Sequence, residues 1–277
     1  MKKHIITIIA LAIGAAAFAQ STQEEYLEKY LRLANRLGYA GVGMETYIDK
    51  WEAAFPQDGM MLEARCNYFL EKAMNNQLVA KAQDKYLGNK PVLSIPDSTG
   101  KAVNYFQETF FDDELFGQAV SYVNKAIELY PLDLIYRADL ITCFLAYEKE
   151  SPDMAVKEMD KLVEMQKSQH PGWLVKGSPA GEDDFSELMS EYCVKLWSIG
   201  TPSAYEAFFQ LSEKLSKIYP KNSNYIDNIG SYWLVAKNNE KKAMKYYKKA
   251  LKMNPSDEVA KTNIRIIERR QAKKKKS

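Results

Sequence analysis

The sequence predicts an all-α protein in which antiparallel helix pairs stack into a solenoid, interrupted by one short β-hairpin. The first observation behind this prediction is that small and aromatic residues recur at fixed steps within helix-forming segments. The second is a set of four Pro-x-Asp/Asn turns, which begin at Pro56, Pro131, Pro220 and Pro255. Proline cannot continue a helix, and the Asp or Asn that follows can cap the next one. The turns therefore indicate repeated joints between helix pairs.

The best-defined helix pair lies between residues 222 and 257. Its second helix, in KKAMKYYKKALKMNPSD, contains no glycine and no proline before the turn, and its apolar residues share one face at helical spacing. Alanine on that face lets a neighbouring helix approach closely, and an aromatic ring fills the space beside it. The residues expected to pack are Ile226, Ile229, Gly230 and Trp233 in the first helix and Ala243, Tyr247 and Ala250 in the second, which Pro255 ends.

A second copy of this pattern lies in QAVSYVNKAIELYPLD. Ala119, Val123, Ala126 and Pro131 follow one another at steps of four, three and five, as Ala243, Tyr247, Ala250 and Pro255 do. Together these spacings resemble the tetratricopeptide repeat (TPR), whose helices carry Leu-Gly-x-x-aromatic and Ala-x3-aromatic-x2-Ala-x4-Pro. The resemblance implies a right-handed TPR-like solenoid in which the first helices of successive repeats line a concave groove for peptides or partner proteins.

Carried onto the best repeat, the resemblance places four residues on the groove side: Asn224, Asp227, Asn228 and Ser231. Their short polar side chains suit hydrogen bonds to an extended backbone. They are not the Lys/Asn set with which some TPR proteins clamp a C-terminal carboxylate, and Asp227 would repel one. The alternative is that all four are ordinary solvated helix residues.

Two insertions are expected between the helices. Residues 91–106 read as a hairpin, because two β-rich runs flank Pro96-Asp97-Ser98-Thr99-Gly100, and residues 170–184 form an irregular loop. A final polar helix over 257–270 would cap the solenoid. We therefore predict a repeat domain over 20–268 and a basic tail over 269–277.

The N-terminus has the layout of a signal peptide over residues 1–19. Lys2 and Lys3 precede an apolar run, and Ala17-Phe18-Ala19 offers small residues at the two positions that signal peptidase reads. The run, of about 13 residues, is shorter than the roughly 20 that span a bilayer. We therefore expect an exported protein, periplasmic or secreted, with no integral membrane span after processing; an uncleaved anchor is the alternative.

Charge excludes one class of partner. Without the signal peptide and the six basic residues near the C-terminus, the body carries a net charge of about −6. A nucleic-acid binder needs a basic face on its folded part. We therefore expect no nucleic-acid partner.

Candidates for catalysis are weak. His170 is the one histidine after residue 19 and lies in a predicted loop, and residues 112–114 and 182–184 are acidic groups placed to cap helices. Cys66, Cys143 and Cys193 lie in helical apolar stripes and read as small buried hydrophobes. We expect no catalytic residue, no metal site and no cofactor.

The predicted function is a non-catalytic protein–protein interaction scaffold or adaptor of the cell envelope or periplasm, with a protein or peptide partner. The alternative is a small-ligand binder or enzyme accessory that uses the inserted hairpin and the 170–184 loop as a lid. Self-association into a homo-oligomer stays open, because an uncapped apolar repeat edge would dimerise.

Export gives a direct prediction. Signal peptidase should cut after Ala19, so N-terminal sequencing of the protein from the envelope fraction should begin at Gln20. Material that begins at Met1 would instead indicate a retained anchor.

Overall fold

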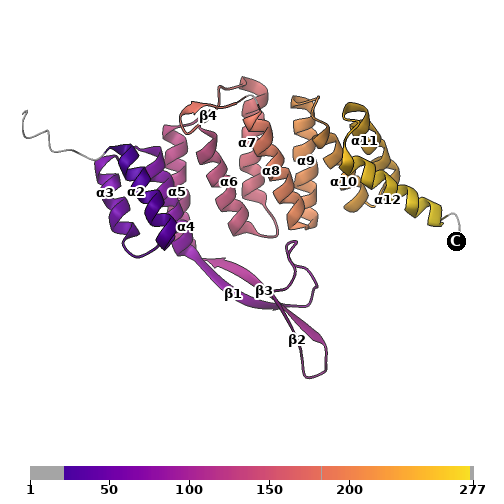
Figure 1. Ribbon diagram of the computed structural model, residues 1–277, viewed down its shortest axis with the longest axis horizontal. Coiled ribbons are helices and arrows are strands. Elements are labelled where there is room, and N and C mark those ends of the chain that lie inside the picture. Colours follow the sequence, from indigo (N-terminus) through magenta and orange to yellow (C-terminus); the bar gives the residue numbers. More distant parts are fainter. Residues whose placement is uncertain (1–21, 182, 275–277) are drawn as a thin grey trace, which may run out of the picture.

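The computed structural model describes residues 22–181 and 183–274 as a row of helices with a small β-sheet projecting from one edge (Figure 1). The predicted signal peptide lies outside these residues. The helices are α2 (Gln23–Leu37), α3 (Met44–Ala54), α4 (Gly59–Ala73), α5 (Asp113–Leu129), α6 (Leu134–Glu148), α7 (Asp153–Gln169), α8 (Asp184–Ile199), α9 (Pro202–Ile218), α10 (Ser223–Val235), α11 (Glu240–Met253) and α12 (Glu258–Lys274). The strands are β1 (Met74–Lys81), β2 (Leu93–Pro96), β3 (Ala102–Phe111), β4 (Leu174–Val175) and β5 (Ser178–Pro179).

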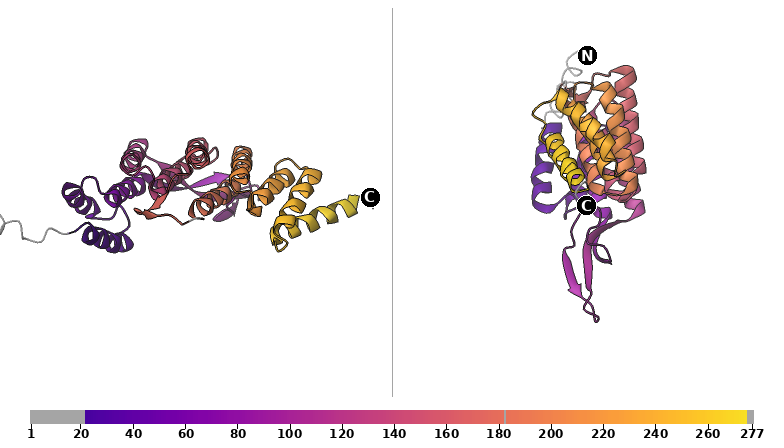
Figure 2. Two further views of the ribbon diagram at one scale, coloured as in Figure 1. Left: turned by 90° about the horizontal axis from the view of Figure 1, so that it is seen from above. Right: turned by 90° about the vertical axis from the view of Figure 1, so that its right-hand side faces the viewer.

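The helices pack in consecutive pairs. α2 packs on α3, α4 on α5, α6 on α7, α8 on α9 and α10 on α11, and α12 closes the row against α11. Seen from above, α4, α6, α8 and α10 lie in one layer and α5, α7 and α9 in the other (Figure 2). The prediction of an all-α solenoid of helix pairs with a small β insertion is confirmed.

The four Pro-x-Asp/Asn turns are the joints between pairs. Their polar side chains each accept a hydrogen bond of 3.0 Å from a backbone N–H in the first turn of the next helix. The caps are Asp58 for α4, Asp133 for α6, Asn222 for α10 and Asp257 for α12. Each joint therefore starts the first helix of a pair or the final helix.

The small residues of the last pair permit close helix contact. Ala243, Tyr247 and Ala250 are fully buried, and a Cβ atom at Gly230 would lie 2.8 Å from the Tyr247 ring. Ala119, Val123 and Ala126 are likewise fully buried in α5. Trp233 departs from this pattern, because it is only half-buried and its neighbour Tyr232 occupies the core instead.

The inserted sheet is larger than the predicted hairpin. β2 and β3 pair as expected around the turn at 97–101, but β1 pairs with β3 over its whole length, giving the strand order β1-β3-β2. α4 runs directly into β1, and the sheet returns to α5 where the Asp112 N–H donates to the Ala73 carbonyl at 2.9 Å. The sequence analysis did not predict β1, because β1 pairs with β3, which is separated from it in the chain by a loop and by β2.

Two further segments differ from expectation. The loop over 170–184 contains the two-residue strands β4 and β5, and the Gly177 N–H donates to Asp133 at 2.8 Å. α12 extends to Lys274, so the first part of the predicted basic tail is helical. The Nζ atom of Lys274 lies 3.3 Å from Oε1 of Glu240 in α11. Residues 275–277 lie outside the described chain.

The apolar core follows the row as three successive clusters. One joins α2 to α6, the next joins α6 to α10, and the last joins α10 to α12. Each helix pair thus contacts mainly its neighbours, as in repeat proteins generally. Over the described part of the chain, no helix combines the length and apolar character needed to cross a bilayer.

The contact at Gly230 can be tested. Gly230→Ala places a methyl group against the fully buried Tyr247 ring, which cannot move without disturbing the core. Overpacking of this kind typically costs about 1–3 kcal/mol. We expect the free energy of unfolding, measured by urea denaturation, to fall by about that amount.

Gly117→Ala is the matched control, because Gly117 is also mid-helix but a Cβ atom there meets nothing within 4 Å. Alanine should stabilise α5 by about 0.5–1 kcal/mol through its higher helix propensity. Equal effects of the two substitutions would show that Gly230 does not set the distance between α10 and α11.

Candidate functional site

A groove of about 480 Å³ lies where α8, α10 and the start of α12 meet. α8 and α10 are the first helices of successive pairs, and α12 is the final helix, in the position where the next first helix would lie. The groove is lined by Ser190, Val194 and Trp197 of α8, Phe208 of α9, Asn224, Asp227, Asn228 and Ser231 of α10, Asp257 just before α12, and Val259 of α12. The structure therefore brings all four predicted groove residues together on one surface.

Two of the four are already engaged within the protein. The Asn228 amide donates to the Ser212 hydroxyl at 3.3 Å, and the Ser231 hydroxyl accepts a hydrogen bond from Tyr247 at 3.2 Å. These bonds fix both side chains at the groove wall. Asn224 is exposed, and among the described residues no hydrogen bond is seen for its side chain.

Asp227 is not a solvated helix residue. Its side chain is buried, with 6% of the residue exposed, and its Oδ1 atom has no hydrogen-bond partner among the described residues. Burial, with a smaller contribution from the nearby Asp257, raises the pKa of Asp227 to about 7. Near neutral pH this carboxyl group is therefore divided between its neutral and its charged form.

The apolar part of the groove was missed by the sequence analysis. Val194 is 68% exposed, and Trp197 contacts Phe208 at 4.9 Å between ring centroids. Both residues follow directly after members of the buried stripe of α8, Cys193 and Leu196. Two exposed-side apolar residues, each next to a core residue of the same helix, were the sequence signal that would have predicted the apolar wall of the groove.

A second group of unsatisfied carboxyl groups lies between α4 and α6. Glu63 Oε2 and Asp139 Oδ2 are buried without a hydrogen-bond partner among the described residues. Burial and the charge of Glu63 raise the pKa of Asp139 to about 7, while the positive charge of Lys176, in the β4–β5 turn, acts in the opposite direction. Lys176 has the same effect on Glu63. Lys176 therefore offsets part of the negative charge here, while the nearby Asp133 adds to it.

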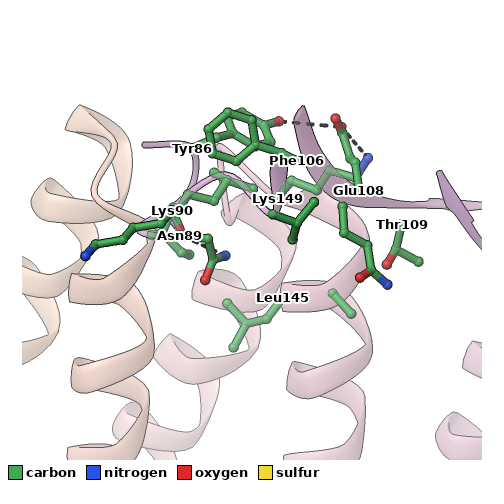
Figure 3. A pocket seen from close by; sticks show the side chains of 13 residues that line it. Tyr86, Asn89, Lys90, Phe106, Glu108, Thr109, Leu145 and Lys149 are labelled. Carbon is green, nitrogen blue, oxygen red and sulfur yellow. Dashed lines mark hydrogen bonds and ion pairs between the residues drawn. The ribbon is translucent and has the colours of Figure 1, made fainter. Parts of the chain in front are cut away.

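Another cavity, of about 510 Å³, lies between the inserted sheet and the C-terminal ends of α6 and α8 (Figure 3). Its charged residue Glu108 accepts a hydrogen bond from Lys149 at 2.8 Å and lies 3.2 Å from Lys81. Desolvation opposes ionisation of Glu108, but these two lysines outweigh it and lower its pKa. The charge of Glu108 is thus neutralised within the chain, and its pair with Lys149 attaches the sheet to α6.

The two insertions do not form a common lid. The sheet contacts α6 near Lys149, at the C-terminal end of that helix, whereas the β4–β5 segment contacts Leu132 and Asp133 at its start. Figure 1 shows them on opposite edges of the row. A helix of 15 residues, about 22 Å long, separates them. The alternative prediction that the two insertions together cover one ligand site is therefore wrong, because they lie at opposite ends of α6.

The cysteines are buried and free, in agreement with their interpretation as small hydrophobes. Burial raises the pKa of Cys193 to about 12, so its sulfur is held as the unreactive thiol. Cys66 and Cys143 lie with their sulfur atoms 3.9 Å apart between α4 and α6. Within the described residues, no group of three or more His, Cys, Asp or Glu side chains is arranged to hold a metal ion.

Comparisons with known proteins add little to this geometry. No model of a protein family matches the chain, and no curated protein matches it. Among solved structures, it is similar to YrrB, described as a TPR protein with an unusual peptide-binding site, at 13% identity and a TM-score of 0.40, over 85% of this chain and 88% of that one. MamA is 13% identical with a TM-score of 0.41, over 84% of this chain and 94% of that one.

The TPR domain of P58(IPK) is 10% identical with a TM-score of 0.31, over 92% of this chain and 67% of that one. The helix pairs, the capped joints and the Ala/aromatic contacts described above themselves give the chain a TPR-like fold.

The state of Asp227 predicts a pH-dependent stability. Its pKa is raised from 3.8 to about 7 on folding, so between these values the unfolded chain is ionised while the folded chain keeps the proton. Stability is therefore lost as the pH rises from about 4 to about 7. Asp227→Asn should remove this pH-dependent loss of stability. We expect the variant to be more stable than the parent at pH 8 by about 1–3 kcal/mol, a value reduced because solvent in the open groove screens the charge.

Urea denaturation at pH 4.5 and pH 8 measures the effect, which should be small at the lower pH. Glu128→Gln, on the exposed side of α5, is the control and should change stability little at either pH. A difference between Asp227→Asn and the parent that does not grow with pH would contradict the buried, unsatisfied state of Asp227.

Proposed function

We propose that the protein is a non-catalytic scaffold or adaptor of the cell envelope or periplasm, and that it binds a segment of a partner protein in the groove of α8, α10 and α12. The observation that carries the proposal is the floor of this groove. There, a buried carboxyl group without a partner, Asp227, lies beside apolar side chains that are open to solvent. Burying a carboxyl group costs free energy unless it is paired, and a bound segment that pairs with it would recover part of that cost.

The shape of the groove favours an extended segment. It crosses from α8 over α10 to α12, and it holds a few side chains rather than a folded domain. Val194, Trp197 and Val259 offer an apolar wall for one anchoring side chain of the partner. Asn224 offers an exposed amide that can both donate to and accept from a peptide backbone.

The proposed location rests on the N-terminal sequence. Lys2 and Lys3, the apolar run and Ala17-Phe18-Ala19 together favour export by a cleaved signal peptide. An exported chain of this kind would meet its partner in the envelope. A scaffold role fits the row of helix pairs, because each repeat adds surface without a catalytic centre.

Site-specific photo-crosslinking tests the proposal in the native cell. A benzoylphenylalanine placed at Asn224, which is exposed and lines the groove, should give a discrete adduct with a partner protein. The same residue placed at Lys248, exposed on α11 outside the groove, is the control and should give none. Adducts of equal yield from both positions, or none from Asn224, would count against the groove as the binding site.

A further inference from the structure

Three first helices of the repeats carry a carboxyl group without a hydrogen-bond partner, at nearly the same place. Glu63 lies five residues after the cap of α4, Asp139 six residues after the cap of α6, and Asp227 five residues after the cap of α10. In the described chain, these are the carboxylates whose buried oxygen atoms have no partner. The repeat thus places acidic groups at nearly corresponding positions of three first helices.

The charged groups near these carboxyl groups differ between the two places. Between α4 and α6, the positive charge of Lys176 acts on both Glu63 and Asp139. At Asp227 the charged neighbour is Asp257, another acid, and no cation of the described residues acts on it. The groove therefore has negative character that the protein does not neutralise.

We propose, resting on the function proposed above, that this groove recognises a lysine or arginine side chain of the bound segment, whose cationic head pairs with Asp227. The methylene stem of such a side chain packs against apolar surface while its head reaches a carboxylate, and Trp197 and Val194 supply that surface. Asp227 and Asp257 both line the groove, so the cationic head of such a side chain lies against two carboxyl groups. Asp257 adds negative charge that favours a cation and disfavours a terminal carboxylate.

Selection from a random heptapeptide library tests the proposal. The full mature chain, its Asp227→Asn variant and the control Glu128→Gln are each used to enrich peptides. The parent and the control should enrich peptides with Lys or Arg at one fixed position, and Asp227→Asn should lose that preference. Because Asp227→Asn is expected to be the more stable protein, its loss of selection would not reflect unfolding.

Single peptides from the selection sharpen the test. Replacing the basic residue of a selected peptide by norleucine should weaken binding to the parent at least tenfold, and should change binding to Asp227→Asn little. Binding of the basic peptide should tighten from pH 5.5 to pH 8, as Asp227 ionises. The titratable groups whose charges couple to Asp227 are Asp257, from the α11–α12 joint, and Tyr247, from α11.

The outcomes separate this inference from the function on which it rests. Trp197→Ala reports whether selected peptides occupy the groove at all. Peptides that need Trp197 but show no basic preference, or that bind Asp227→Asn as tightly as the parent, would overturn the inference and leave the peptide-binding groove in place. Failure to enrich any peptide that depends on Trp197 would overturn both.

Discussion

Wherever a helix begins inside the core of this protein, its first backbone N–H groups face apolar side chains instead of water and need a partner. Asp58, Asp133 and Asp257 provide one while they are themselves buried. Such a start fixes the direction of each new helix, because the cap must lie against both the preceding pair and the following one. The side chains also bind a second group: Asp58 accepts from the Trp51 indole at 2.9 Å, and Asp133 accepts from Gly177. The stacking of the pairs therefore depends on these caps.

The positions of the two insertions follow from the same constraint. The three-stranded sheet leaves the row between α4 and α5, inside a pair, so the capped joints on either side stay intact. The bond between Asp112 and Ala73 closes its base, and α4 still packs on α5. The joint before α8 is the exception. There the β4–β5 segment replaces the Pro-x-Asp/Asn turn, and its contact with the Asp133 cap attaches it to the start of α6.

The groove shows how a repeat can keep an unsatisfied carboxyl group at the expense of stability. The contacts that bury α10 between α9 and α11 also bury Asp227, and the cap of α12 brings a second carboxylate close to it. A neutral side chain at this position would be less costly to bury. At α4 and α6 the corresponding cost is reduced by Lys176. The groove of α8, α10 and α12 is open to solvent and no cation of the described residues acts on Asp227, and on these grounds we propose it as the recognition surface.

The sequence by itself determined the features that arise from neighbours along the chain. The Ala/aromatic spacing of α11, the Pro-x-Asp/Asn caps and the turn between β2 and β3 are local, since helix period, capping and turn geometry involve only a few consecutive residues. The repeat pattern also placed Asn224, Asp227, Asn228 and Ser231 on one face of α10. Only the tertiary structure decided that β1 joins the sheet, that Val194 and Trp197 complete the groove, and that the two insertions lie at opposite ends of α6. It also decided that Asp227 is buried without a partner, because burial depends on which elements pack together, and residues far apart in the chain set that packing.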